Sequence, residues 1–147
     1  MLAAEGLTKY IIGSYVAVME LKGQLQVTSW QEHEIRTLAD DGGKVTRASI
    51  GYRVTGDVDG EAVDDVVMYY RPDGSATVVG LWHLTGSAAG RTGSVMFASD
   101  GDYDGTTALS QVRSVVGSGT GGFVTLGGAG TTTATGEQVE YALDLEF

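Results

Sequence analysis

Short runs rich in Val, Thr, Tyr and Leu alternate with glycine-containing turn signals, at the spacing of about 8 to 15 residues that is typical of strands joined by hairpins. Glycine occurs 23 times in 147 residues and proline only once. Helical periodicity is hardly visible. Because the glycines punctuate the chain instead of clustering in one tract, we expect an all-β fold.

The strand and turn signals predict about eight strands. They fall at 20–30, 45–55, 62–71, 75–84, 93–99, 106–116, 123–126 with 131–135, and 140–147. Asp-Gly pairs at 41–42, 59–60, 73–74, 100–101 and 104–105 are predicted to form the turns, since glycine accepts positive φ. In the first strand, the alternation of side chains predicts that Leu25 and Val27 point inward.

Eight up-and-down strands with no covering helix have two exposed edges, which closure removes. The sequence therefore predicts a single closed antiparallel barrel over residues 19–147, with a two-sheet sandwich as the alternative. A barrel of this size is filled by side chains or holds one small ligand. Residues 1–18 are expected to form an N-terminal extension, either an extra strand or a lid across the mouth, because their apolar side chains would be costly to expose.

The composition excludes several classes of partner. The net charge is −10 and the nine Lys and Arg residues are scattered, so neither nucleic acid nor an anionic membrane is an expected partner. No cysteine is present, which excludes disulfides and thiolate chemistry and fits a reducing cytoplasm. No run approaches the roughly 20 apolar residues of a membrane-spanning helix.

Two motif-like patterns favour turns over cofactor sites. Residues 117–122 match G-x-G-x-x-G, but the residues that follow do not form the helix that this fingerprint requires. Residues 100–105 open like a calcium loop, but its twelfth position is Gln111 instead of Glu. With only His33 and His83, no set of metal ligands is formed. We therefore expect no cofactor and no metal.

A series of ordered motifs resembles a known family. They are Val27-Thr28-Ser29-Trp30, Gly60-Glu61, Tyr69-Tyr70-Arg71-Pro72-Asp73-Gly74-Ser75-Ala76, Val79-Gly80-Leu81, Gly86 with Gly90-Arg91-Thr92-Gly93-Ser94, Gly117-Ser118-Gly119-Thr120-Gly121 and Tyr141-Ala142-Leu143-Asp144-Leu145. Over roughly residues 19–147 the chain is similar to a bacterial domain-of-unknown-function family grouped with the allene oxide cyclase-like, or calycin-like, barrels.

The resemblance implies an antiparallel barrel whose better-known relatives are cofactor-independent isomerases and cyclases, including enzymes that close rings on polyketide-like natural products. The chain departs from the family pattern in one place. A Glu followed by a basic residue is usual after the Val-Gly-Leu stretch, and here Trp82 and His83 stand there. A carboxylate role at that position is therefore not carried over.

Alternation along the predicted strands identifies candidate lumen residues. It places Tyr52, Met68 and Tyr70 on inner faces, and Trp82 on the more apolar face of its strand with His83 outside. The tyrosine hydroxyls would bond either to other wall residues or to a ligand carbonyl. Trp82 would either fill the core or form a stacking wall for an unsaturated ligand.

Two further pairs are candidates for polar chemistry. Gln111 and Arg113 share one face of their strand, and that face is open between inside and outside. If they point inward, Gln111 is a partner for the tyrosines and Arg113 an anchor for a carbonyl or carboxylate. Glu32 and His33 follow the first strand at its rim, where they would serve general acid or base chemistry or form an ordinary polar loop.

The sequence thus predicts a cofactor-independent cyclase or isomerase that holds one small, apolar, carbonyl-bearing molecule inside the barrel. Tyr52, Met68, Tyr70, Trp82 and Gln111 would bind the ligand, and Glu32, His33 and Arg113 would act on it. The alternative is a non-catalytic binding or structural barrel with a filled lumen. A homodimer or other homo-oligomer is left open, with His83 at such a contact or in solvent.

Overall fold

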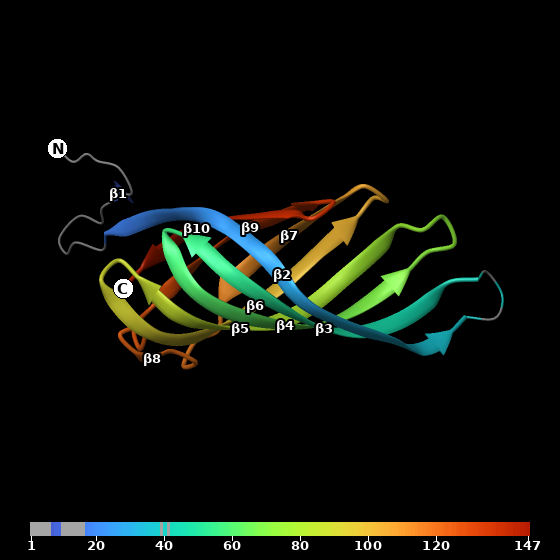
Figure 1. Ribbon diagram of the computed structural model, residues 1–147, viewed down its shortest axis with the longest axis horizontal. Coiled ribbons are helices and arrows are strands. Elements are labelled where there is room, and N and C mark those ends of the chain that lie inside the picture. The colour runs from blue at the N-terminus through green and yellow to red at the C-terminus, as the bar shows by residue number, and fades with distance from the viewer. Residues whose placement is uncertain (1–6, 10–16, 39, 41) are drawn as a thin grey trace.

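Eight long antiparallel strands close into a barrel (Figure 1). The computed structural model describes residues 7–9, 17–38, 40 and 42–147. The barrel strands are β2 (Val18–Thr37), β3 (Lys44–Gly56), β4 (Val58–Tyr70), β5 (Ala76–Ala88), β6 (Arg91–Tyr103), β7 (Thr107–Ser114), β9 (Gly127–Thr135) and β10 (Gln138–Glu146). Because β2 pairs with both β10 and β3, the sheet has no free edge between its long strands, so the barrel is confirmed and the sandwich alternative is wrong.

Two differences from the predicted strands concern the segment at 123–126 and the end of the first strand. The segment predicted as a strand at 123–126 forms turns between β8 (Thr120–Gly121), which pairs with β6, and β9. Strand β2 runs well beyond Trp30, and its outer part pairs with β3 as far as Thr37 opposite Lys44. The polar residues of this outer part are exposed on a projecting hairpin, so no apolar alternation marked them as a strand.

The prediction of turns at the Asp-Gly pairs is confirmed at some positions and wrong at others. Gly74 and Gly105 lie in hairpins with φ of 89° and 102°. The pairs at 59–60 and 100–101 instead lie inside β4 and β6, and Asp41 lies outside the described residues. Gly60 pairs with Gly86 across the sheet, and a Cβ on Gly60 would lie 2.2 Å from the Thr85 carbonyl oxygen. This glycine allows a close approach between the two strands.

One end of the barrel, at the left in Figure 1, is densely packed, and we call it the packed end. Its largest fully buried side chains include Phe97, Leu143 and Leu145, and Phe123 enters from the turns that follow β8. Tyr141 is buried there, and its hydroxyl donates to the Thr55 carbonyl at 2.7 Å and accepts from the Val58 N–H at 3.0 Å. This end is therefore closed by side chains with their polar groups satisfied.

A β-bulge in β2 changes which side chains point inward. Leu25 is buried and Val27 lies opposite Tyr52, so both face the lumen as predicted. The register shifts between Val27 and Ser29, after which Trp30 lies opposite Ile50 on the inner face. A bulge adds one residue and so reverses the alternation beyond it.

The N-terminal extension is described only at β1 (Leu7–Lys9), where Leu7 lies opposite Met19 and Lys9 opposite Val18. These residues add a short strand beside the start of β2, at the packed end in Figure 1. The rest of the predicted lid lies outside the described residues. In the described part of the chain, no helix is long and apolar enough to cross a bilayer.

Candidate ligand site in the barrel lumen

The opposite end of the barrel, which we call the hollow end, contains a cavity of about 760 Å³. Every long strand of the barrel contributes to its wall, and most of that wall is apolar. The apolar lining comprises Leu25, Val27, Trp30, Ile50, Val66, Met68, Ala76, Val78, Trp82, Ala108, Ala134 and Val139. A volume of this size lies within the range of small-molecule sites, which is roughly 300–1,000 Å³.

Trp82 forms part of the cavity wall beside the packed core. Its side chain is 5% exposed and its ring lies 5.1 Å from that of Phe97, measured between centroids. The neighbouring His83 is exposed on the outer wall. The alternation predicted from sequence is therefore confirmed for this pair. Trp82 both packs against the core and presents a surface to the cavity.

Three tyrosines line the cavity, and they differ in their hydrogen bonds. The Tyr70 hydroxyl donates to Glu32 at 3.0 Å, and that of Tyr103 donates to the Gly105 carbonyl at 2.7 Å. The Tyr52 hydroxyl makes no hydrogen bond to the described residues. Burial, followed by the charge of Asp64, raises the pKa of Tyr52. Tyr52 is thus a neutral donor available to a ligand.

Asp64 is the functional candidate that the sequence reasoning missed. It lies on β4 opposite Ile50 and Trp82, and among the described residues that line this cavity it is the only Asp, Glu, Lys, Arg or His. Its Oδ1 atom is buried without a hydrogen-bond partner among the described residues. Burial, and then the charge of Asp65, raise the pKa of Asp64 to about 7. The carboxyl group therefore exchanges a proton readily near neutral pH.

The sequence did contain a signal for this residue. Asp64 and Asp65 stand together in the middle of an apolar strand, and alternation must direct one of two neighbours inward. Gly80, on the next strand, leaves space beside the carboxyl, because a Cβ there would lie 3.2 Å from Asp64 Oδ1. Asp65 is exposed on the outer wall.

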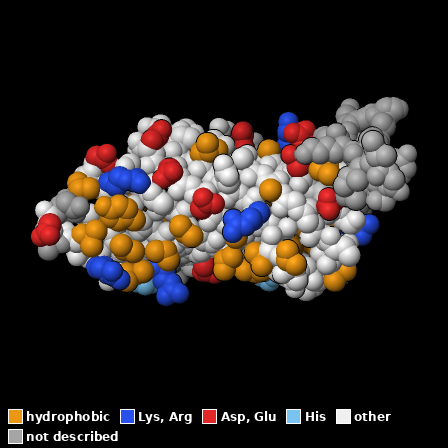
Figure 2. Space-filling model, turned by 180° about the vertical axis from the view of Figure 1, so that it is seen from behind, with side chains coloured by type: hydrophobic (Ala, Val, Ile, Leu, Met, Phe, Trp, Pro, Cys, Tyr) orange, Lys and Arg blue, Asp and Glu red, His pale blue; other side chains and the backbone are white. Residues whose placement is uncertain are grey.

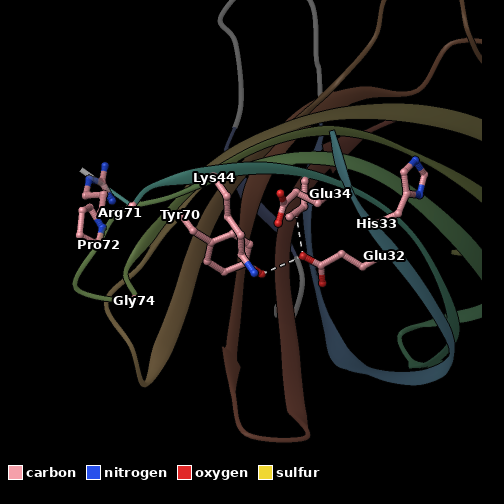
Figure 3. A pocket seen from close by; sticks show the side chains of 10 residues that line it. Glu32, His33, Glu34, Lys44, Tyr70, Arg71, Pro72 and Gly74 are labelled. Atoms are coloured by element: carbon pink, nitrogen blue, oxygen red, sulfur yellow. Dashed lines mark hydrogen bonds between the residues drawn. The ribbon is translucent and has the colours of Figure 1, made fainter. Parts of the chain in front are cut away.

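Glu32 lies at the rim of the hollow end, beside an open pocket of about 590 Å³ (Figure 3). Its carboxylate accepts hydrogen bonds from Thr46 at 2.7 Å, from Tyr70 at 3.0 Å and from the Trp30 indole at 3.0 Å. Lys44 lies 5.3 Å from the centre of the Tyr70 ring. Tyr70 lines both cavities, so Glu32 holds a side chain that separates them.

The electrostatics of the rim favour an ionised Glu32. Partial burial acts to raise its pKa, but the hydrogen bonds from Thr46, Trp30 and Tyr70 and the charge of Lys44 together lower it. His33 points away from Glu32 in Figure 3 and pairs with Arg47 on the other face of the hairpin. The predicted acid–base pair is therefore divided, with Glu32 acting as a hydrogen-bond acceptor that orders the rim.

The structure corrects the expectation for Gln111 and Arg113. Both are exposed on the outer wall, and the inner face of β7 carries Ser110 and Val112 instead. Leu109, which shares their face and suggested an apolar interior, is itself 54% exposed. Neither Gln111 nor Arg113 can reach a ligand in the lumen from that face.

Apolar side chains also occur on the outside of the molecule (Figure 2). Four exposed ones lie on the neighbouring strands β4 and β5, namely Val63, Val67, Val79 and Leu81. Val67 and Val79 are directly paired. These residues explain why apolar runs on β4 and β5 do not by themselves distinguish the lumen from the outer wall.

The fold and the cavity define a closed antiparallel barrel with one hollow end that can enclose a small molecule. The family model described as "Protein of unknown function (DUF3224)" matches residues 21–145, so the chain belongs to the DUF3224 family. A solved structure of a DUF3224 protein of unknown function from Shewanella oneidensis MR-1 is similar in fold, with a TM-score of 0.72 and 19% sequence identity over 87% of this chain and 96% of that chain. No curated protein matches the chain.

Proposed function

We propose that this protein is a cofactor-independent isomerase or cyclase that holds one small, largely apolar carbonyl compound in the hollow end of the barrel. The observation that supports the proposal is the cavity of about 760 Å³, whose mostly apolar wall carries one ionisable carboxyl group and tyrosine hydroxyls. Such a site fixes a flexible substrate in one conformation and presents few polar groups to it. The lack of cysteine suits the cytoplasm as its place of action.

Binding in the lumen is tested first, with the neutral fluorescent probe N-phenyl-1-naphthylamine and the bicyclic ketone 2-tetralone as competitor. We expect one saturable site per chain and full displacement by the ketone. Ala134→Phe, which fills the cavity, should weaken probe binding by at least about tenfold. Ala129→Phe, on the exposed face of the same strand, is the matched control. Equal binding by both variants would contradict the proposal.

A non-catalytic binding barrel is the second candidate. It is favoured by the single carboxyl group in the described lining, which contains no His, Lys or Arg beside it, since many acid–base sites combine two or more such groups. The two candidates predict the same binding result but differ in turnover. Deuterium exchange at the carbons next to the carbonyl of bound 2-tetralone separates them.

A further inference from the structure

We propose that Asp64 is the proton-transfer residue of the lumen and that the Tyr52 hydroxyl stabilises the enolate that the transfer creates. This inference rests on the proposed function and names the group that would carry it out. Asp64 on β4 and Tyr52 on β3 are diagonal neighbours on the inner face of the barrel. Tyr52 pairs with Ala62, two residues before Asp64.

The two side chains have unused hydrogen-bonding capacity, unlike Tyr70 and Tyr103 of the same lining. Asp64 Oδ1 is buried without a partner among the described residues, and the Tyr52 hydroxyl makes no hydrogen bond to them. Tyr70 and Tyr103 are already bonded to Glu32 and Gly105. A buried polar atom without a partner is costly, so a ligand that supplies the partner gains affinity.

The part of the lining that the structure describes also contains no Lys, Arg or His that would hold Asp64 permanently ionised as an ion pair. A carboxyl group in such surroundings can accept a proton and later return it. Glu32, by contrast, accepts three hydrogen bonds at the rim that stabilise its ionised form. The proton-transfer role therefore belongs to Asp64 and not to the carboxylate predicted from sequence.

The reaction is balanced without a co-reactant. The Asp64 carboxylate removes a proton from the carbon next to the ligand carbonyl, the C–H electron pair becomes the enolate double bond, and the carbonyl oxygen takes the negative charge. The Tyr52 O–H donates to that oxygen. Return of the proton from Asp64 to a conjugated carbon gives an isomer. Alternatively, the enolate carbon attacks an electrophilic carbon of the same molecule, and Asp64 protonates the oxygen that receives the displaced electron pair.

The test uses 2-tetralone in D₂O, with deuterium incorporation at the carbons next to the carbonyl followed by mass spectrometry. We expect the intact protein to accelerate exchange over buffer. Asp64→Asn should reduce that acceleration by at least about 100-fold, while the dissociation constant for the ketone changes by less than about threefold. Asp65→Asn, which alters the exposed neighbour, should exchange like the original protein. Tyr52→Phe should slow exchange by about 10- to 100-fold, whereas Tyr69→Phe should not.

The outcomes distinguish the inference from the function on which it rests. Bound ketone with the same exchange rate in the Asp64→Asn variant would overturn the inference and leave lumen binding intact. Failure of the original protein to bind the ketone would overturn both. Preferential binding of 2-aminotetralin, which places an ammonium group on the same skeleton, with no exchange of the ketone would also overturn the inference, because Asp64 would then be an anchor for a cation.

Discussion

The two ends of the barrel are built from the same strands but differ in whether their buried polar groups are hydrogen-bonded. At the packed end, the Tyr141 hydroxyl is bonded to the backbone at Thr55 and Val58 and is surrounded by side chains. At the hollow end, Asp64 and Tyr52 face about 760 Å³ of space with unused hydrogen-bonding capacity. The packed end thus stabilises the fold, and the hollow end retains polar groups that cost stability unless a ligand bonds to them.

The largest effect is expected from a truncation at the packed end. Phe123 is fully buried and its ring lies 6.0 Å from that of Phe147, so Phe123→Ala leaves a cavity that the surroundings cannot fill. The free energy of unfolding should fall by about 3–5 kcal/mol, measured by guanidinium denaturation. A loss below about 1 kcal/mol would mean that this end is not packed as described.

Removing the charge of Asp64 at the hollow end should instead raise the free energy of unfolding. The folded-state pKa of Asp64, about 7, lies above its ordinary value of 3.8, so its contribution to stability is complete below pH 3.8 and is lost as pH rises through about 7. The described titratable groups around it are Tyr52 on β3, Asp65 and Tyr70 on its own strand and Tyr103 on β6, and none of these is a cation.

Asp64→Asn should therefore stabilise the protein at pH 8 by up to about 4 kcal/mol and have little effect at pH 4. Asp65→Asn serves as the control, because its side chain is exposed. Thermal or chemical unfolding across this pH range measures the difference. An equal effect at both pH values would contradict a carboxyl group that ionises at a cost.

A pair of tyrosine substitutions compares the ends directly. Tyr141→Phe leaves the Val58 N–H without its partner and should cost about 1–3 kcal/mol of unfolding free energy. Tyr52→Phe removes a hydroxyl that bonds to no described residue, so it should cost less than about 0.5 kcal/mol. Similar losses from both substitutions, measured by urea denaturation, would remove this distinction between the ends.

A pair of valines gives a further comparison of the two ends. Val95 is 1% exposed in the packed core, whereas Val78 borders the cavity. Truncation to Ala should cost about 2 kcal/mol at Val95 and less than about 1 kcal/mol at Val78, because Val78 already lacks neighbours on one side. Differential scanning calorimetry of the two variants measures the two losses of stability. A larger loss for Val78→Ala than for Val95→Ala would contradict this prediction.

The sequence predicted the barrel well because turn chemistry and alternation are local signals. Trp82, Tyr52, Met68 and Tyr70 could be placed on the inner wall in this way. The sequence could not show which face of β7 points inward, because apolar Leu109 is exposed while polar Ser110 faces the lumen. The orientation of Gln111 and Arg113 therefore could not be predicted.

The bulge after Val27 limited the prediction of the rim. A single inserted residue reverses the alternation, so that Glu32 points toward Tyr70 and His33 away from it, and no residue type marks such a bulge unambiguously. The space around Asp64 also depends on several strands at once. Alternation could have identified the Asp64–Asp65 pair, but not the lack of partners around Asp64.

The most direct test is an NMR titration with 2-tetralone that follows the methyl and amide signals of both ends. We predict that shifts concentrate at Ile50, Val66, Met68 and Val78 around the hollow end, while Leu143 and Leu145 of the packed end stay unchanged. Shifts confined to the outer-wall residues Val67, Val79 and Leu81, or no saturable shifts at all, would contradict a ligand-binding lumen.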